Sequence, residues 1–515
     1  MQSKDEIIPF PLELKRRKGR GFCFRGVEFV HHTNLPIAES AFFILSPTQK
    51  YILLVFLFTF LLSLLLNWHF TLTFLIGALT ILYFADLIFN LYLILKSFIN
   101  PPEISFVPKE IAGLDGRKLP FYTIFCPLYK EWEVLPQFVT AISRLDYPKD
   151  KLQVLLLLEE NDEKTIKVAR DYRLPSYFET IIVPHSLPKT KPKALNYGLK
   201  LAKGEYAVIY DAEDIPEKNQ LKKACLAFDR VNEKTICIQA KLNYYNPHQN
   251  LLTRLFTAEY SLWFDLILIG LQSIHAPIPL GGTSNHFRLK ALRSLEGWDP
   301  FNVTEDCDLG IRLAKKGYHT AMMDSTTFEE ANCQPLNWLR QRSRWIKGYI
   351  QTYFVHMRQP KDFLHDWRNP DILTFQLVVG GKILSIFINP LMWLTTLCYF
   401  LFRPMVGQLI ESFYPPAIMY LGVFCLAVGN FLYLYYYMVG CAKRGYFDLL
   451  KYVFLVPFYW LGMSLAGWKA LYEIAYHPHY WAKTTHGFHI NNQKATNQAV
   501  NIVGQQLVDR TIAVS

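Results

Sequence analysis

The sequence predicts an α/β domain with a doubly wound, mostly parallel sheet, inserted between two groups of transmembrane helices. Of the 515 residues, 51% are hydrophobic and only 19% are charged, a balance too apolar for an ordinary soluble protein. Long apolar segments lie on both sides of a more polar central region. Within that region, short apolar runs alternate with helical segments, which is typical of a parallel sheet covered by helices on both faces.

The first apolar segment, 51–95, is long enough for a hairpin of two helices, since one crossing needs about 20 residues. Asn67-Trp68-His69 interrupt it. After the central region, three more stretches are long enough to cross: 383–402, 412–442 and 452–468. The stretch before them, broken by Gly380-Gly381, is typical of an interfacial helix. We therefore expect about five crossings. If Pro457 breaks the last stretch, the tail is cytosolic; otherwise it lies on the far side, and both remain open.

Four apolar runs are the predicted strands, with helices between them. The strands are expected at 121–127, 153–158, 181–184 and 206–210, and the helices at 131–144, 163–172 and 192–202. Ligands of such sheets bind beyond the carboxyl ends of the strands. The chain thus divides into a basic cytosolic N-terminal segment, 1–48; a transmembrane hairpin, 51–95; a cytosolic domain, 100–370; an interfacial helix with about three membrane segments, 371–475; and a tail, 476–515.

The net charge is +11, and much of the excess lies near predicted spans, as in Lys15-Arg16-Arg17-Lys18-Gly19-Arg20. Such charge beside spans is typical of the positive-inside bias and complements anionic lipids, so we expect contact with membrane lipids and no nucleic acid. The nine cysteines form no C-x-x-C pair, and the N-terminus lacks the pattern of a cleavable signal peptide. The soluble part is therefore expected in the cytosol, within a multi-pass protein of the plasma (inner) membrane.

Acidic side chains follow two predicted strands directly. Run 154–158 leads into Glu159-Glu160-Asn161-Asp162, and run 206–210 leads into Asp211-Ala212-Glu213-Asp214. Carboxylates at a strand end suit a hard divalent cation, so Asp211 and Glu213, with Asp214 as a substitute, are candidate metal ligands. The alternative is a solvated turn before Pro216.

Asp306, in Thr304-Glu305-Asp306, is the candidate general base, because a sugar hydroxyl needs a carboxylate to take its proton as it attacks. The alternative is structural: Thr304 is an N-cap, and the acids favour the first turn of a helix that includes 309–316. Gln341, Arg344 and Trp345 share one helix face, where the guanidinium suits a diphosphate and the indole suits a pyranose ring. Near a membrane, Trp345 could instead be an interfacial anchor.

Together these motifs resemble the processive, membrane-embedded family 2 inverting glycosyltransferases, similar to cellulose, hyaluronan, chitin and mannan synthases. The resemblance covers about 119–350, in the order of the family, and rests on six motifs: 126–131, Lys193-Ala194-Leu195-Asn196, 211–214, Gly281-Gly282-Thr283-Ser284-Asn285, Thr304-Glu305-Asp306 and Gln341-x-x-Arg344-Trp345. It implies a GT-A-like domain, a nucleotide-sugar donor and Mg²⁺ or Mn²⁺. We expect a UDP-sugar in preference to a GDP-sugar.

Carried over residue by residue, the resemblance implies roles for individual side chains. Catalysis falls to Asp306 with Glu305; metal binding to Asp211, Glu213 and Asp214; acceptor contact to Trp345 and Asp306; and donor contact to Pro127, Tyr129, Glu131, Glu159, Glu160, Lys193, Asp211, Gln341 and Arg344. The chain departs from the usual Asp-Asp and Asp-x-Asp motifs, with Glu159-Glu160 and Asp211-x-Glu213 in their places.

These observations predict an enzyme that takes a sugar from the cytosol, adds it to a growing polysaccharide and exports the product through its own spans. A single transfer to a lipid acceptor is the alternative among enzymes, and a transporter or receptor without catalysis is the alternative from another class. Two features stay open: the run 479–487 is either a mobile lid or a basic aromatic belt, and Asp86 in the second span is either functional or snorkels to the interface.

Overall fold

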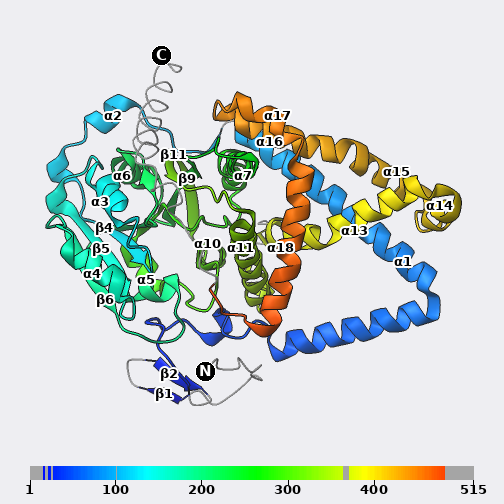
Figure 1. The fold of residues 1–515 in the computed structure, drawn as a ribbon, viewed down its shortest axis with the longest axis horizontal. Helices are drawn as coiled ribbons and strands as arrows, with labels where there is room; N and C mark the ends of the chain where they lie inside the picture. The colour runs from blue at the N-terminus through cyan, green and yellow to red at the C-terminus, as the bar shows by residue number, and fades with distance from the viewer. Residues whose placement is uncertain (1–14, 18–20, 25–26, 100, 364–370, 482–515) are drawn as a thin grey trace.

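The computed structural model describes residues 15–17, 21–24, 27–99, 101–363 and 371–481. Figure 1 shows the sheet and its helices on one side of the molecule and the long apolar helices on the other. The N-terminal part forms a small antiparallel sheet of β1 (Lys15–Arg17), β2 (Gly21–Phe24) and β3 (Val27–Phe29).

Helix α1 (Pro47–Phe98) contains the whole first apolar segment. It begins with a capping box, in which the Ser46 side chain accepts from the Gln49 N–H and the Gln49 side chain accepts from the Ser46 N–H. At Asn67 the backbone leaves helical geometry, and α1 continues as a second arm in a new direction (Figure 1). The bend falls in the polar break seen in the sequence, so the first apolar segment forms two helical arms that meet at Asn67.

Among the described residues, three helices are long and apolar enough to cross a membrane: α1, the helix 371–401 and the helix 416–443. The second comprises α12 (Asp371–Phe375), a π-helical turn at 376–381 and α13 (Lys382–Leu401), and the third comprises α15 (Pro416–Phe424), a π-helical turn at 425–429 and α16 (Asn430–Lys443). Helix α14 (Arg403–Ser412) joins them. A fourth candidate is the pair 447–453 and 456–476, which is bent by 67° and ends in α18 (Val456–Tyr476). The expected count of five crossings stays a prediction.

The central sheet has eight strands in the order β6-β5-β4-β7-β10-β9-β11-β8. Strands β6, β5, β4 and β7 are mutually parallel, as are β9 and β11, while β10 and the edge strand β8 are antiparallel to their neighbours. The mostly parallel α/β sheet is confirmed. The strands are β4 (Tyr122–Leu128), β5 (Leu152–Glu159), β6 (Phe178–Val183), β7 (Tyr206–Ile209), β8 (Ile215–Pro216), β9 (Thr235–Tyr244), β10 (Asn285–Arg288) and β11 (His319–Glu329).

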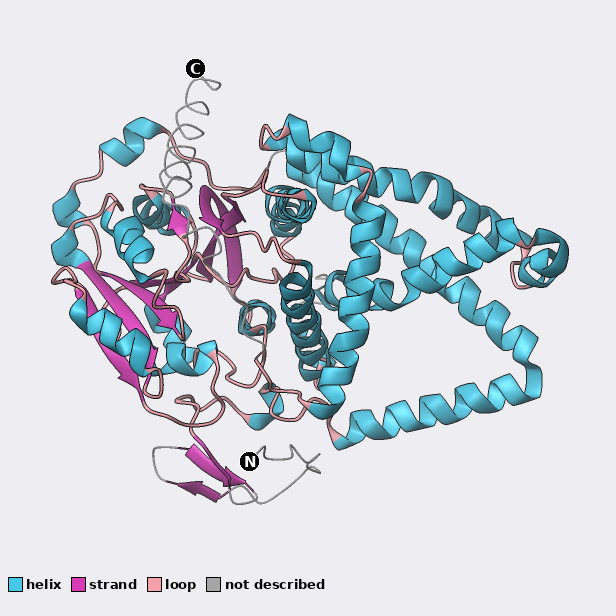
Figure 2. Ribbon diagram, viewed as in Figure 1, coloured by secondary structure: helices cyan, strands magenta, loops and turns pink. Residues whose placement is uncertain are grey.

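Helices cover both faces of this sheet (Figure 2). Helices α5 (Lys191–Leu199) and α9 (Leu289–Ser294) pack on one face, and α3 (Leu135–Ser143), α4 (Glu163–Asp171) and α6 (Gln220–Arg230) pack on the other. Every residue of β5 is buried, and its leucines alternate between the two cores because side chains point to opposite faces in turn.

Four further helical elements connect the sheet to the membrane helices. They are α7 (Leu251–Leu262), continued by a π-helical turn and α8 (Leu268–Ser273); α10 (Glu305–Lys315); and α11 (Pro335–His356). Helix α11 packs along α18, so the helix that carries Gln341 and Trp345 lies against the last apolar helix.

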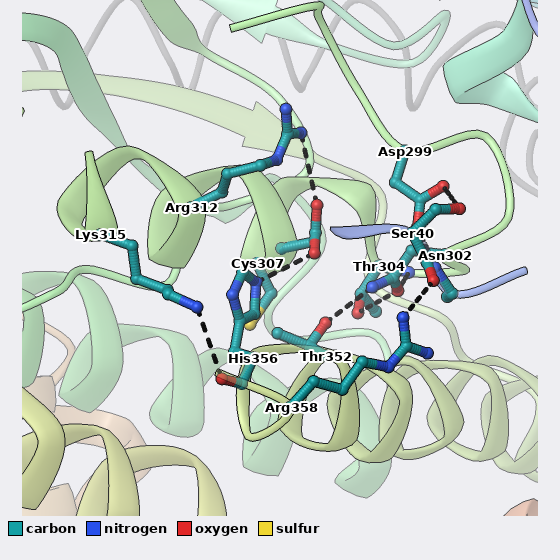
Figure 3. Close-up of polar contacts among 12 residues, drawn as sticks. Ser40, Asp299, Asn302, Thr304, Cys307, Arg312, Lys315, Thr352, His356 and Arg358 are labelled. Carbon is teal, nitrogen blue, oxygen red and sulfur yellow. Dashed lines mark hydrogen bonds and ion pairs between the residues drawn. The ribbon is translucent and has the colours of Figure 1, made fainter. Parts of the chain in front are cut away.

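Residues 33–44, which we name the N-terminal strap, run across the domain before α1 begins. Asp299 accepts the Ser40 hydroxyl at 2.7 Å and the Ala41 N–H at 2.6 Å, and the Arg358 guanidinium donates to the carbonyls of Ala38 and Ser40 (Figure 3). Burial and the nearby carboxylate of Asp308 raise the pKa of Asp299 to about 6. The strap is thus held by the buried Asp299, on the loop before α10, and by the half-buried Arg358, just after the end of α11.

Candidate active site

A cavity of about 410 Å³ lies between the edge of the sheet, helices α10 and α11, and the membrane helices. Seven of the residues singled out in the sequence line it together: Asp211, Glu213, Glu305, Asp306, Gln341, Arg344 and Trp345. Residues from the ends of β7 and β11 therefore meet two helices that come later in the chain.

The acids after β7 sit on a tight turn. The fully buried Asp214 holds this turn, because its Oδ2 accepts the Asp211 N–H at 2.7 Å and also the Thr283 hydroxyl. Asp214 does not line the cavity, whereas Asp211 and Glu213 do. Burial and the carboxylate of Asp211 raise the pKa of Glu213 to about 8.

Glu305 and Asp306 form the first turn of α10, so the helix N-terminus points their carboxylates toward the cavity rim. Thr304 occupies the N-cap position, but its side chain makes no capping hydrogen bond and instead lies 3.4 Å from Asn302 Oδ1. Asp306 Oδ1 accepts the Cys307 N–H at 2.8 Å. Burial raises the pKa of Asp306, and burial together with Asp306 raises that of Glu305 to about 8.

Lys191, at the start of α5, brings positive charge to these acids. Its ammonium binds Asp211 Oδ1 and the Gly282 carbonyl, the latter at 2.9 Å. Burial disfavours the charged ammonium, but the carboxylates of Asp211 and Glu305 outweigh this and raise the pKa of Lys191. Lys191 therefore carries a full positive charge beside the strand-end acids.

Gln341, Arg344 and Trp345 face the cavity from one side of α11. Gln341 Oε1 and Arg344 Nε are buried atoms with no hydrogen-bond partner among the described residues. The Arg344 guanidinium lies 4.6 Å from the centre of the Trp481 ring, which also lines the cavity. An acceptor oxygen and an N–H donor are thus left for a ligand, as buried polar groups in a binding site are.

Arg342 helps to hold in place the side of α11 that faces the cavity. It forms a bidentate pair with Glu259 of α7, with Nη1 to Oε1 at 3.0 Å, and donates to the Tyr459 hydroxyl of α18 at 2.5 Å. Its guanidinium also lies 4.7 Å from the centre of the Trp345 ring. The orientation of Trp345 therefore depends on contacts that join α7, α11 and α18.

The remaining donor residues expected from the sequence do not line this cavity: Pro127, Tyr129, Glu131, Glu159, Glu160 and Lys193. They follow the parallel strands β4 and β5, next to β7, or lie on α5. Lys193 is buried and pairs with Glu159 at 2.8 Å, Glu160 accepts the His185 N–H at 2.8 Å, and the Lys189 ammonium lies 5.5 Å from the Tyr129 ring centre.

Sequence reasoning missed six charged residues that line the cavity: Lys191, Glu259, Glu329, Glu330, Arg342 and Lys382. Glu329 and Glu330 lie at and just after the end of β11, so acids at a strand end could have identified them, as they identified Asp211. Burial and the carboxylate of Glu213 raise the pKa of Glu329 well above its ordinary value.

The cavity continues among the long apolar helices. There it is lined by Asp86 and Asn90 of α1, Lys382 of α13 and Tyr433 of α16, among others. The Tyr433 hydroxyl donates to Asp86, and the Lys382 ammonium lies 3.3 Å from the centre of the Trp263 ring. Asp86 therefore faces this polar space and a tyrosine partner.

The residues present fit a divalent cation. Asp211 and Glu213 line the cavity with carboxylate oxygens, which hard cations prefer as ligands. Within the described residues, no three acidic, histidine or cysteine side chains are grouped closely enough to hold a metal alone. This suits a Mg²⁺-type site, in which one or two carboxylates share the ion with substrate oxygens.

The second half of α11 holds the loop that precedes Glu305 (Figure 3). Thr352 Oγ1 accepts from Asn302 Nδ2 at 2.9 Å, and His356 Nε2 lies 3.0 Å from Asp308 Oδ1. A Cβ added to Gly348 would lie 2.3 Å from Thr304 Oγ1 and 2.7 Å from its Cβ. Loop and helix therefore touch too closely for any side chain at position 348.

Gly348→Ala is expected to lower turnover by about 10- to 100-fold, because a displacement of about 1 Å at a reacting group is this costly. Alanine would stabilise the helix by about 1 kcal/mol, but the clash costs about 1–3 kcal/mol and prevails. Steady-state kinetics and a thermal melt test both effects. Gly77→Ala is the matched control, since an added Cβ there meets nothing closer than 3.7 Å. An active, more stable Gly348→Ala variant would contradict the expectation.

Comparison with known proteins gives a family match over more than half of the chain. The model described as "Glycosyl transferase family group 2" matches residues 206–482. Relatives include a "Probable glycosyltransferase YdaM" of Bacillus subtilis, 27% identical over 46% of this chain and 58% of that protein, and a "Beta-monoglucosyldiacylglycerol synthase" of Nostoc sp., 28% identical over 48% and 51%. A "Probable glucomannan 4-beta-mannosyltransferase 7" of Oryza sativa subsp. japonica is 26% identical over 48% and 44%.

The chain spans about half the length of the curated relatives it matches. Among solved structures, the mannosyltransferase PcManGT from Pyrobaculum calidifontis, in complex with GDP-Man and Mn²⁺, aligns with a TM-score of 0.41 and 17% identity, covering 78% of this chain and 99% of its own.

Proposed function

The chain belongs to glycosyl transferase family group 2, and from this membership we propose that it is an inverting, metal-dependent glycosyltransferase that works at a membrane surface. The observation that carries the proposal is the single cavity in which Asp211, Asp306 and Trp345 meet. It places a candidate base, candidate cation ligands and a flat aromatic ring around one space large enough for a sugar.

In this proposal Asp306 takes the proton of the acceptor hydroxyl, which attacks the anomeric carbon of the donor. The nucleotide diphosphate leaves from the opposite face, so the configuration inverts and no nucleophile of the enzyme is needed. Arg344 and Gln341 bind the diphosphate, and Trp345 stacks against the acceptor sugar. A divalent cation held by Asp211 and Glu213, when bound, supplies neutralising charge for the leaving diphosphate.

Donor binding extends from the cavity along the ends of β4 and β5. In this proposal Tyr129, Glu131 and Glu160 contact the nucleotide there, with Pro127, while Glu159 and Lys193 support that edge as a buried ion pair. Lys191 steadies Asp211 and adds positive charge near the diphosphate. We expect a UDP-sugar in preference to a GDP-sugar, presented from the cytosol.

The part of the cavity on the acceptor side of Trp345 suits two kinds of product. The cavity reaches past Trp345 to Asp86 and Tyr433 among the membrane helices, a route suited to a growing polysaccharide that is exported through the spans. The same space suits a lipid acceptor that enters from the bilayer and receives a single sugar. A transporter or receptor without catalysis would leave the paired strand-end acids and Asp306 without a role.

The test is to incubate the purified protein, reconstituted in lipid, with a panel of UDP- and GDP-sugars and Mg²⁺ or Mn²⁺, and to measure the release of nucleotide diphosphate. We expect one donor to be used, release to stop with a chelator, and release to return with added metal. A ladder of product sizes indicates polymerisation, and a single lipid-linked product indicates one transfer. Release that persists in both Asp306→Asn and Asp211→Asn proteins would refute the proposed site.

A further inference from the structure

The side-chain amide of Gln351, on α11, is fully buried and makes hydrogen bonds to two separate segments. Its Oε1 accepts the N–H of Val303 at 3.1 Å, and its Nε2 donates to the carbonyl of Pro478 at 2.9 Å. Val303 belongs to the loop that leads into Glu305 and Asp306, whereas Pro478 lies beyond the end of α18. One amide therefore joins two segments that are far apart in the sequence.

Residues 477–481, which we name the C-terminal segment, lie along α11 next to this amide. The Lys347 ammonium donates to the Tyr480 carbonyl at 2.8 Å and pairs with Glu473 at 3.0 Å. The His479 ring lies 3.2 Å from the Phe301 carbonyl and 3.1 Å from the Phe42 carbonyl of the N-terminal strap. These contacts place Trp481 on Arg344, inside the cavity.

We propose that Gln351 is a positioning residue that couples the seating of the C-terminal segment to the placement of the loop that leads into Asp306. The inference rests on the proposed transfer reaction, in which Asp306 is the base. When the segment is seated, Gln351 uses both ends of its amide and holds Val303. When the segment leaves, the buried Nε2 loses its acceptor, which is unfavourable, so the side chain turns to find another and releases the Val303 N–H.

The coupling has a consequence for turnover. Thr352 holds the same loop at Asn302, and His356 contacts Asp308 of α10, so the fold of the loop is kept while its fine position changes. A shift of this kind moves Asp306 relative to the donor, whose binding groups Gln341 and Arg344 lie on the first half of the helix. We therefore expect the loss to fall on kcat more than on the KM for the donor.

Gln351→Glu separates the two bonds, because it keeps an oxygen that can accept the Val303 N–H and removes the donor to Pro478. We expect kcat to fall about 10- to 100-fold with a donor KM within about threefold of the unmodified protein. Hydrogen exchange is expected to quicken in the C-terminal segment and also at Val303, because a buried carboxylate without the Pro478 contact is unfavourable and turns away from the Val303 N–H. Gln359→Glu, the same change at an exposed position close to the end of α11, is the control and is expected to change neither quantity.

Two results would overturn the inference: faster exchange in the segment with Val303 still protected and kcat within about twofold, or no change at either end. Lys347→Met gives an independent arm if Gln351→Glu does not fold, because it removes the donor to the Tyr480 carbonyl and leaves Gln351 and the Phe301 contact intact. It too must expose Val303. If the unmodified protein releases no nucleotide diphosphate from any donor, the proposed function fails, and the exchange measurements still test the coupling.

Discussion

Asp306→Asn is expected to lower the kcat of sugar transfer by about 10²- to 10⁴-fold, the contribution typical of a general base. Asparagine keeps the shape of the side chain and an oxygen that can accept the Cys307 N–H, so α10 keeps its first turn. It removes the group that takes the proton from the acceptor hydroxyl. The KM for the donor is expected to stay close to that of the unmodified protein, since Gln341 and Arg344 are unchanged. Nucleotide diphosphate release, measured with saturating acceptor, checks both expectations.

Asp146→Asn provides the control for this substitution, because Asp146 is half-exposed and pairs with Lys222 far from the cavity wall. It is expected to be as active as the unmodified protein. If Asp306→Asn retained more than about a tenth of the turnover, Asp306 could not be the base. The neighbouring Glu305 would then be the next candidate, and Glu305→Gln would be the decisive variant.

Arg342→Met is expected to destabilise the protein by about 3–5 kcal/mol, because it leaves the carboxylate of Glu259 without its charged partner in a mostly buried site. Methionine fills a similar volume, so the loss reports on the charge and its hydrogen bonds. Trp345 and the Tyr459 hydroxyl also lose a contact. Thermal unfolding in detergent, followed by a tryptophan-independent probe such as a thiol-reactive dye on the buried cysteines, measures the effect.

The compensating variant is Arg342→Met combined with Glu259→Leu, which removes both charges. Its stability is expected to recover most of the loss, since apolar side chains often replace a buried ion pair at little cost. Its affinity for the acceptor is expected to be lower than that of the unmodified protein, because Trp345 has lost its contact with the Arg342 guanidinium. Equal stability of the single and double variants would show that the pair contributes little to the fold.

The strands that lead into the candidate site could be predicted from the sequence because they are buried on both faces. Each of β4, β5 and β7 is a continuous apolar run with a sharp polar end, and each lies within about two residues of the predicted range. Strand β10 gives no such signal. Its sequence Asn-His-Phe-Arg is polar, and it is buried because its side chains find partners, as His286 does with the Tyr122 hydroxyl at 2.6 Å.

The residues of the candidate site could be predicted from the sequence wherever one helix or one turn fixes the relative positions of several side chains. Gln341, Arg344 and Trp345 share a face of α11 by spacing alone, and Glu305 and Asp306 are adjacent. Spacing could not choose between Lys191 and Lys193, because residues two apart on α5 point to different sides, and only the packing of α5 on the sheet shows which side meets the cavity. Asp214 resembled a ligand in sequence, yet its Oδ2 accepts the Asp211 N–H and holds the turn.

The order of strands in the sheet has a consequence for biogenesis. Strand β8 lies at the edge of the sheet and pairs with β11. Pro216 can therefore pair with Thr327 only after Thr327 has left the ribosome, more than a hundred residues later. By then α1 has long been synthesised, and the nascent domain still has one half of its sheet unfinished. Non-local pairing of this kind is slow and exposes unpaired edges. Slower translation between these two strands would lengthen that exposure, whereas the same delay placed after α11 would leave the sheet already closed.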